Sequence, residues 1–137
     1  MSSFVAKKDS IVIVDKSLFM RNILKNIMAN FNCNIHEATD AVGALNISLR
    51  YDPNVIFISI ESDKCWPSLV QSLKKKQPCK VVAYSTGVTR DMIASAFFAG
   101  VDEILVNPQN QRERIEKCLA NNPGLYNLPT NANVLGS

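Results

Sequence analysis

Short apolar runs alternate with amphipathic segments along most of this chain. Runs this brief and this rich in β-branched residues are typical of strands that are buried on both faces. Between them, apolar residues recur at helical spacing. The alternation predicts right-handed strand–helix–strand crossovers, a parallel sheet and helices on both of its faces, which is a three-layer α/β sandwich. The five predicted strands are Ile11–Val14, Cys33–Ala38, Val55–Ile60, Val81–Tyr84 and Ile104–Val106.

Five helices are expected between and after these strands, and their periodic apolar positions define the faces that should pack on the sheet. These positions are Met20, Ile23, Leu24, Ile27 and Met28; Ala41, Ala44, Leu45, Ser48 and Leu49; Leu69, Val70 and Leu73; Ile93, Ala96 and Phe97; and Ile115, Cys118 and Leu119.

Length and composition bound the remaining possibilities. The chain has 137 residues, of which 47% are hydrophobic and 20% charged, and this fits one globular domain. We expect that domain at residues 10–121, a flexible N-terminal segment at 1–9 and an irregular tail at 122–137. The net charge of +3 is too small to predict a nucleic-acid surface, and no apolar run approaches the roughly 18 residues of a membrane span. Four separated cysteines and one histidine, His36, do not form a metal-binding pattern.

Several segments resemble one known family. Residues 9–21 read DSIVIVDKSLFMR, which is similar to the first strand and helix of response regulator receiver domains, above all the chemotaxis (CheY-like) type. EATDAVGAL, DPNVIFISI, KVVAYST and FAGVDEILVNP follow in the family's order and spacing, so the resemblance covers about residues 10–120. It implies a five-stranded, flavodoxin-like (βα)5 receiver fold.

The resemblance also implies where the chemistry of such a domain lies. In the family, two adjacent acids and an aspartate at the end of the third strand hold Mg²⁺; the aspartate accepts a phosphoryl group, and a lysine balances its charge. Here only the first acid is present. The corresponding pocket consists of Asp15, Lys16, Ser59, Glu61, Ser85, Asn107 and Pro108, of which Ser85 and Pro108 also match the family.

These replacements predict a vestigial phosphorylation pocket. Mg²⁺ requires oxygen ligands, whereas Lys16 removes one and adds a positive charge, so Mg²⁺ binding should be weak or absent. The Ser59 hydroxyl would need an adjacent base to act as a nucleophile, and no histidine is placed to serve as one. For the Lys16 ammonium two positions stay open: the vacated cation site, paired with Asp15 and Glu61, or solvent.

Without phosphoryl transfer, function should depend on surfaces. Receivers commonly bind partners through the fourth helix, fifth strand and fifth helix. The candidate partner-binding residues on this face are Phe97, Phe98, Ile104, Arg112 and Glu116. Adjacent aromatic residues on one helix point about 100° apart, so Phe97 and Phe98 are not both expected in the core.

The sequence therefore predicts an atypical, phosphorylation-independent pseudo-receiver that acts as a cytoplasmic protein–protein interaction module in two-component or chemotaxis signalling. We expect no enzymatic activity, no cofactor, no direct nucleic-acid contact and no membrane insertion; a homodimer through the candidate face is one form of the interaction. Two alternatives stay open. One is a receiver phosphorylated at another residue, such as Asp15 or Ser59, and the other is a small-molecule sensor that uses the remodelled pocket.

Overall fold

The computed structural model describes residues 9–76 and 78–120. Strands and helices alternate along this part of the chain, as predicted. The strands are β1 (Asp9–Val14), β2 (Cys33–Ala38), β3 (Val55–Ser59), β4 (Lys80–Ser85) and β5 (Glu103–Val106). The helices are α1 (Leu18–Met28), α2 (Ala41–Tyr51), α3 (Trp66–Lys76), α4 (Arg90–Ala99), the short 3-10 helix η1 (Pro108–Asn110) and α5 (Arg112–Ala120).

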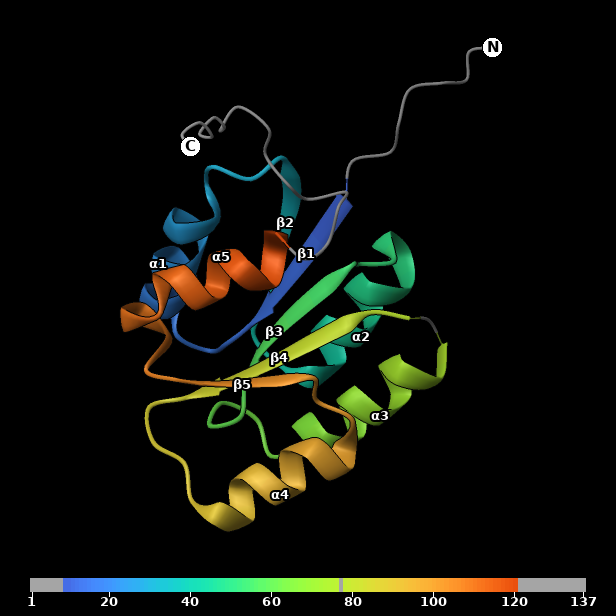
Figure 1. The fold of residues 1–137 in the computed structure, drawn as a ribbon. Coiled ribbons are helices and arrows are strands. Elements are labelled where there is room, and N and C mark those ends of the chain that lie inside the picture. Colours follow the sequence, from blue (N-terminus) through green and yellow to red (C-terminus); the bar gives the residue numbers. More distant parts are fainter. Residues whose placement is uncertain (1–8, 77, 121–137) are drawn as a thin grey trace.

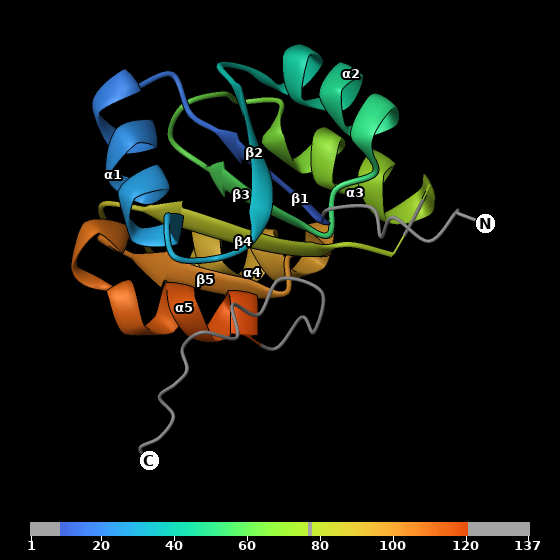
Figure 2. The ribbon, with the colours of Figure 1, turned by 90° about the horizontal axis from the view of Figure 1, so that it is seen from above.

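The strands form one parallel sheet in the order β2-β1-β3-β4-β5. Helices α1 and α5 cover one face, and α2, α3 and α4 cover the other (Figures 1 and 2). The predicted three-layer, flavodoxin-like (βα)5 fold is confirmed. Because the chain proceeds from β1 to one side of the sheet and from β3 to the other, the carboxyl ends of these two strands flank the position where ligands bind in such sheets.

Two hydrophobic cores follow from the alternation of side chains along the central strands. On β1, Ile11 and Ile13 face the core beneath α1 and α5, whereas Val12 and Val14 face the core beneath α2, α3 and α4. All four side chains are buried, as expected of a strand covered on both faces. The sheet is therefore fixed from both sides, and its carboxyl edge is a rigid base for the loops that follow.

Polar side chains define where three of the helices begin. The side chains of Ser17, Asp40 and Thr89 accept hydrogen bonds from backbone N–H groups in the first turns of α1, α2 and α4, respectively. Such caps satisfy donors that have no partner within the helix. All three helices begin at the carboxyl edge of the parallel sheet: α1 after β1, α2 after β2 and α4 after β4.

Some predicted helix faces are wrong. Leu49 on α2 is 53% exposed, and Ile93 and Phe97 on α4 are 37% and 51% exposed. The buried residues of α4 are Ala96 and Ala99. Small side chains on the inner face leave little room beneath the helix, so the larger residues lie on its outer face. The third strand also ends at Ser59, one residue before the predicted Ile60.

The predicted domain limits are met only in part by described residues. Asp9 already belongs to β1, one residue before the predicted start, and α5 ends at Ala120. The predicted tail at 122–137 and residues 1–8 of the predicted N-terminal segment lie outside the described residues. None of the helices in the described ranges has the length and hydropathy needed to span a bilayer.

We expect Gly100→Ala to destabilise the protein by about 1–2 kcal/mol, because a Cβ is disfavoured in the left-handed region. Gly100 ends α4 with φ 113°, and an added Cβ would lie 3.3 Å from Cγ of Lys74. Urea unfolding of the variant measures the loss. Gly87→Ala is the matched control, since a Cβ added at that position would meet nothing within 4 Å. Equal effects of the two substitutions would contradict this account of the turn.

Candidate functional site

A small cavity lies at the carboxyl edge of the sheet, beside the ends of β1, β3 and β4. Its volume is about 220 Å³. Five of the seven predicted pocket residues line it: Asp15, Ser59, Glu61, Ser85 and Pro108. Five further residues complete the lining: Ser17, Met20, Ser62, Tyr84 and Thr86. Hydroxyl groups are therefore the predominant polar groups of this site.

Asp15 is the buried anion of the cavity, with 4% of its surface exposed. Its Oδ1 accepts hydrogen bonds from the Ser17 N–H at 2.8 Å and from the Ser62 hydroxyl at 2.9 Å. Its Oδ2 accepts a hydrogen bond from the Tyr84 hydroxyl at 2.7 Å. Both carboxylate oxygens are thus engaged by groups of the protein itself.

Tyr84 was not predicted as a site residue. It lies on β4, its ring packs in the core beneath α1 and α5, and its hydroxyl reaches the carboxyl edge. Burial, together with the neighbouring Asp15 carboxylate, raises the pKa of Tyr84. The hydroxyl is therefore protonated and donates a hydrogen bond to Asp15. The sequence did contain a signal for this role, namely a tyrosine at the end of an otherwise apolar strand. A buried tyrosine hydroxyl needs a hydrogen-bond partner, so a polar group had to lie nearby.

The two serines at the strand ends are buried and have local partners. The Ser59 oxygen accepts a long hydrogen bond of 3.4 Å from the Glu61 N–H. The Ser85 hydroxyl donates to the Gly87 carbonyl at 2.8 Å and accepts from the Gly87 N–H at 3.2 Å. Ser85 therefore stabilises the turn that follows β4.

Glu61 connects the loop after β3 with the loop after β4. Its Oε1 accepts from the Thr86 N–H at 3.1 Å, and its Oε2 accepts from the Thr86 hydroxyl at 2.7 Å. Burial acts to raise the pKa of Glu61, but the hydrogen bonds from Thr86, together with the nearby Ser85 hydroxyl, outweigh it and hold the pKa below its usual value. The carboxyl group is therefore an anion at neutral pH. Thr86, which directly follows β4, was not among the seven predicted pocket residues.

Lys16 and Asn107 do not line the cavity. Lys16 is exposed, and among the described residues its ammonium forms no ion pair with Asp15 or Glu61. Its backbone N–H instead donates to the Ser62 hydroxyl. Of the two positions considered for the Lys16 ammonium, the vacated cation site and solvent, the side chain takes the solvent-exposed one. Asn107 adopts a left-handed conformation, φ 53°, and precedes η1.

The residues of this site do not fit Mg²⁺. The ion needs several oxygen ligands in near-octahedral geometry. Here both oxygens of Asp15 are engaged by hydrogen-bond donors, and both oxygens of Glu61 bind Thr86. Across residues 9–76 and 78–120, no group of three or more His, Cys, Asp or Glu side chains is arranged to hold a metal ion.

The predicted partner-binding residues lie around the β5 edge, with α4 on one face of the sheet and α5 on the other (Figure 2). Phe98 is 89% exposed, whereas Ile104 is partly buried and packs against the core beneath α4. Arg112 and Glu116 form an ion pair with each other at 3.7 Å. Exposed apolar groups and a charged helix therefore adjoin on this edge.

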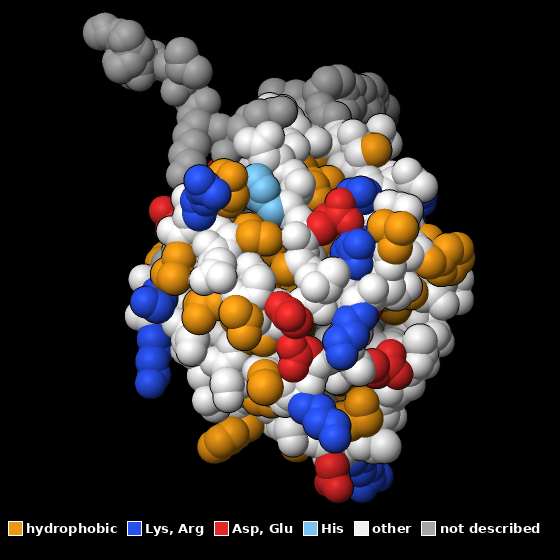
Figure 3. Space-filling view, turned by 180° about the vertical axis from the view of Figure 1, so that it is seen from behind, with side chains coloured by type: hydrophobic (Ala, Val, Ile, Leu, Met, Phe, Trp, Pro, Cys, Tyr) orange, Lys and Arg blue, Asp and Glu red, His pale blue; other side chains and the backbone are white. Residues whose placement is uncertain are grey.

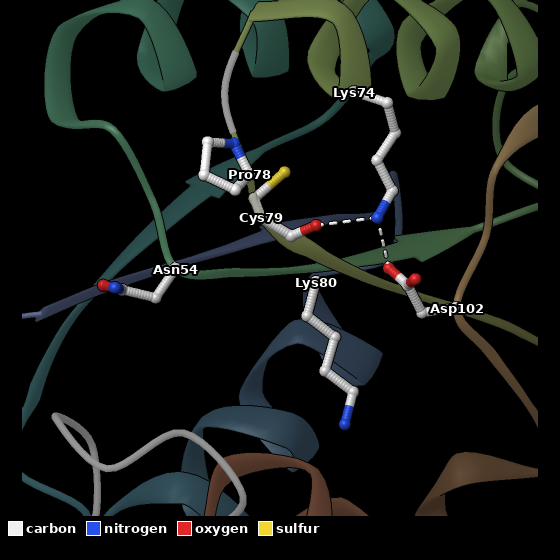
Figure 4. Close-up of a pocket in the computed structure, with 6 residues that line it drawn as sticks. All are labelled: Asn54, Lys74, Pro78, Cys79, Lys80 and Asp102. Atoms are coloured by element: carbon white, nitrogen blue, oxygen red, sulfur yellow. Dashed lines mark hydrogen bonds and ion pairs between the residues drawn. The ribbon is translucent and has the colours of Figure 1, made fainter.

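A larger hollow of about 450 Å³ lies at the opposite, amino edge of the sheet. In it the Lys74 ammonium donates to the Cys79 carbonyl and the Asp102 carboxylate, whereas the Lys80 side chain points away from this pair (Figure 4). The Asp102 carboxylate also accepts from the Val81 N–H. These bonds join α3 to the start of β4, so the hollow has a structural role and we do not take it as the functional site.

A third hollow, beside β2 and α2, contains His36 stacked on the Tyr51 ring. Burial lowers the pKa of His36. On the face seen in Figure 3, hydrophobic side chains are dispersed among charged ones rather than gathered into one patch. This face is a weaker candidate than the carboxyl edge of the sheet.

No protein-family model and no curated protein matches this sequence. Solved structures do match. A response regulator from Thermotoga maritima is 20% identical, with 83% of this chain and 99% of that chain covered and a TM-score of 0.73. The chemotaxis protein CheY4 of Vibrio cholerae is 17% identical, with 84% and 98% covered and a TM-score of 0.74.

A CheY-like response regulator receiver domain protein from Methanospirillum hungatei JF-1 is similar to the same extent. It is 20% identical, with 84% of this chain and 94% of that chain covered, and its TM-score is 0.74. At these identities the likeness concerns the fold. The chain therefore has the receiver fold of two-component response regulators.

Proposed function

We propose that this chain is a phosphorylation-independent receiver module that acts through protein–protein contacts in bacterial two-component or chemotaxis signalling. The observation that supports this most strongly is the state of Asp15, whose two oxygens accept three hydrogen bonds from Ser17, Ser62 and Tyr84. These hydrogen bonds stabilise the negative charge of the Asp15 carboxylate, which a bound cation would otherwise balance. Metal binding would require breaking bonds that satisfy a buried carboxylate.

The chemistry of the strand ends agrees with this proposal. Ser59 takes the position where the family resemblance implies a phosphoaccepting aspartate, and in the described part of the chain its hydroxyl is bonded to the Glu61 N–H rather than to a base. Asn107, in the position of the charge-balancing lysine, carries no charge. We therefore propose weak or absent Mg²⁺ binding, no enzymatic activity and a cytoplasmic protein without direct nucleic-acid contact.

We further propose that a protein partner binds across α4, β5 and α5. The most exposed large apolar side chain of the described residues, Phe98, lies there, next to the half-exposed Phe97. Exposed aromatic residues are efficient anchors for a partner, because they bury a large area at low entropic cost. A second copy of this chain is one such partner, and formation of a homodimer through this face can be tested with the purified protein alone.

The cavity supports one alternative function, a sensor of a small molecule. Its volume of about 220 Å³ and its hydroxyl-rich lining would accept a small polar ligand. A ligand that raises the melting temperature of the wild-type chain, but not of a variant in which Ser59 is replaced by Val, would favour this function.

We expect no response when the purified chain is titrated with Mg²⁺ and then beryllofluoride, a phosphoryl mimic. The reason is that both Asp15 oxygens already accept hydrogen bonds, which the ion would have to displace or share. The measurements are the fluorescence of the single tryptophan, Trp66, and the melting temperature. A saturable change at millimolar metal would contradict the proposal and support phosphorylation at a residue such as Asp15 or Ser59.

Tyr84→Phe should lower the free energy of unfolding by about 1–3 kcal/mol, since a buried carboxylate loses a hydrogen-bond donor. Urea unfolding at neutral pH measures the loss. Tyr51→Phe is the matched control, because the Tyr51 ring is partly exposed and stacks on His36. If both substitutions have the same small effect, Asp15 does not depend on the Tyr84 hydroxyl.

Phe98→Glu should abolish self-association without lowering stability, because the side chain is exposed and a charge at the centre of an apolar contact must be desolvated. Sedimentation velocity over a range of protein concentrations measures the dimer. Leu49→Glu places the same charge on the exposed face of α2 and should leave the dimer intact. A wild-type chain that remains monomeric at every concentration would exclude the homodimer.

A further inference from the structure

We propose that the Glu61 carboxylate is a built-in anion that takes the place of an added phosphoryl group and holds the loop between β4 and α4, residues 86–89, in one fixed arrangement. Through this loop, which we call the anchored loop, Glu61 also fixes the position of α4. The inference rests on the proposed function in one respect, namely that no phosphoryl group is added to the pocket.

The contact is specific to one residue of the anchored loop. Both oxygens of the Glu61 carboxylate are used, and both bind Thr86: one accepts from its backbone N–H at 3.1 Å and the other from its hydroxyl at 2.7 Å. A bidentate contact fixes direction as well as distance. The two loops that follow β3 and β4 are thereby joined beside the cavity that both residues line.

The groups that bind the Glu61 carboxylate are neutral N–H and O–H donors of a loop, the kind of group that also binds phosphate. Within residues 9–76 and 78–120, Glu61 forms no ion pair, and its carboxylate oxygens accept hydrogen bonds from the neutral donors of Thr86. Backbone N–H groups and hydroxyls that converge on one point are typical of sites for phosphate and carboxylate groups. A carboxylate that stays ionised at neutral pH satisfies such donors permanently.

The family resemblance implies that the Ser85 hydroxyl would bind a phosphoryl group. In this chain that hydroxyl donates to the Gly87 carbonyl, inside the turn. The donors that remain directed at the cavity are those of the next residue, Thr86, and Glu61 has engaged them. The anion for this loop therefore comes from the chain and not from phosphorylation.

The anchored loop leads directly into α4. Thr86 lies three residues before Thr89, whose side chain accepts the Met92 N–H and caps the helix. The buried side chains of α4 are only Ala96 and Ala99, so packing holds this helix weakly. A contact that fixes the entry to α4 therefore has a large influence on where the exposed Phe97 and Phe98 lie.

Hydrogen–deuterium exchange of the full chain, followed by mass spectrometry of peptides, tests this inference. We expect Glu61→Ala to speed backbone exchange over residues 86–99 by about fivefold or more, since the bonds that close the loop are lost. Exchange in β1 and β3 should not change. Glu61→Gln, which keeps one acceptor oxygen but no charge, should give an intermediate effect. Glu113→Ala, an exposed acid at the start of α5, is the matched control.

A second arm tests the anion itself. Sodium acetate should slow the exchange of residues 86–99 in Glu61→Ala towards the wild-type rate, whereas sodium chloride at equal ionic strength should not. Unchanged exchange of residues 86–99 in Glu61→Ala would overturn the inference, and equal rescue by both salts would show that the anion is not specifically recognised and would overturn it too.

Global unfolding is excluded by a further variant. If Glu61→Ala also speeds exchange in β1 and β3, the variant Thr86→Val is measured instead, because it removes only the hydroxyl donor. Faster exchange confined to residues 86–99 in Thr86→Val supports the inference, and unchanged exchange there overturns it. The beryllofluoride titration of the wild-type chain is independent of these measurements. A silent titration with unchanged exchange would therefore overturn the role of Glu61 alone, and a saturable titration would overturn the proposed function.

Discussion

A carboxylate enclosed at the end of a buried strand must be satisfied, and this requirement organises the functional end of the molecule. Asp15 follows β1, in which five of the six residues are buried, and its own surface is 4% exposed. An unpaired anion in such a place is very costly. The chain provides three donors from three elements: the start of α1, the loop after β3, and β4. The same bonds that satisfy Asp15 also hold these elements together and engage both of its oxygens.

The parallel sheet explains why residues so distant in sequence meet. Tyr84 and Asp15 are 69 positions apart, yet their side chains are hydrogen-bonded because β1 and β4 both end at the carboxyl edge. Glu61 and Thr86 meet at the same edge for the same reason. A fold that brings its strand ends together can thus replace one polar network by another without changing its core, which is how fold and chemistry become separable.

The sequence predicted the order of elements, the parallel sheet and five of the ten residues that line the cavity, because strand periodicity and strand-end positions depend on local pattern. The predicted pocket did not include the other five lining residues, which are Ser17, Met20, Ser62, Tyr84 and Thr86. Tyr84 was interpreted as an apolar strand residue, and only the position of Asp15 across the sheet makes its hydroxyl relevant. Lys16 was considered as a replacement for the cation, because the sequence shows the charge of a side chain but not where that side chain points. In the structure Lys16 is exposed. Leu49, Ile93 and Phe97 were assigned to cores by periodicity alone, which does not reveal how closely a helix approaches the sheet.

The composition of α4 connects the core, the loop and the surface. Alanines on its inner face bring the helix close to the sheet, and they bury little apolar area. The larger side chains are consequently turned outward, where Phe98 is almost fully exposed. A helix held so weakly by packing depends on its two ends, the αL turn at Gly100 and the Thr89 cap that follows the anchored loop. Hydrogen bonds at the carboxyl edge and the outward-facing aromatic residues are therefore parts of one arrangement: what closes the pocket also determines where the exposed aromatic residues lie.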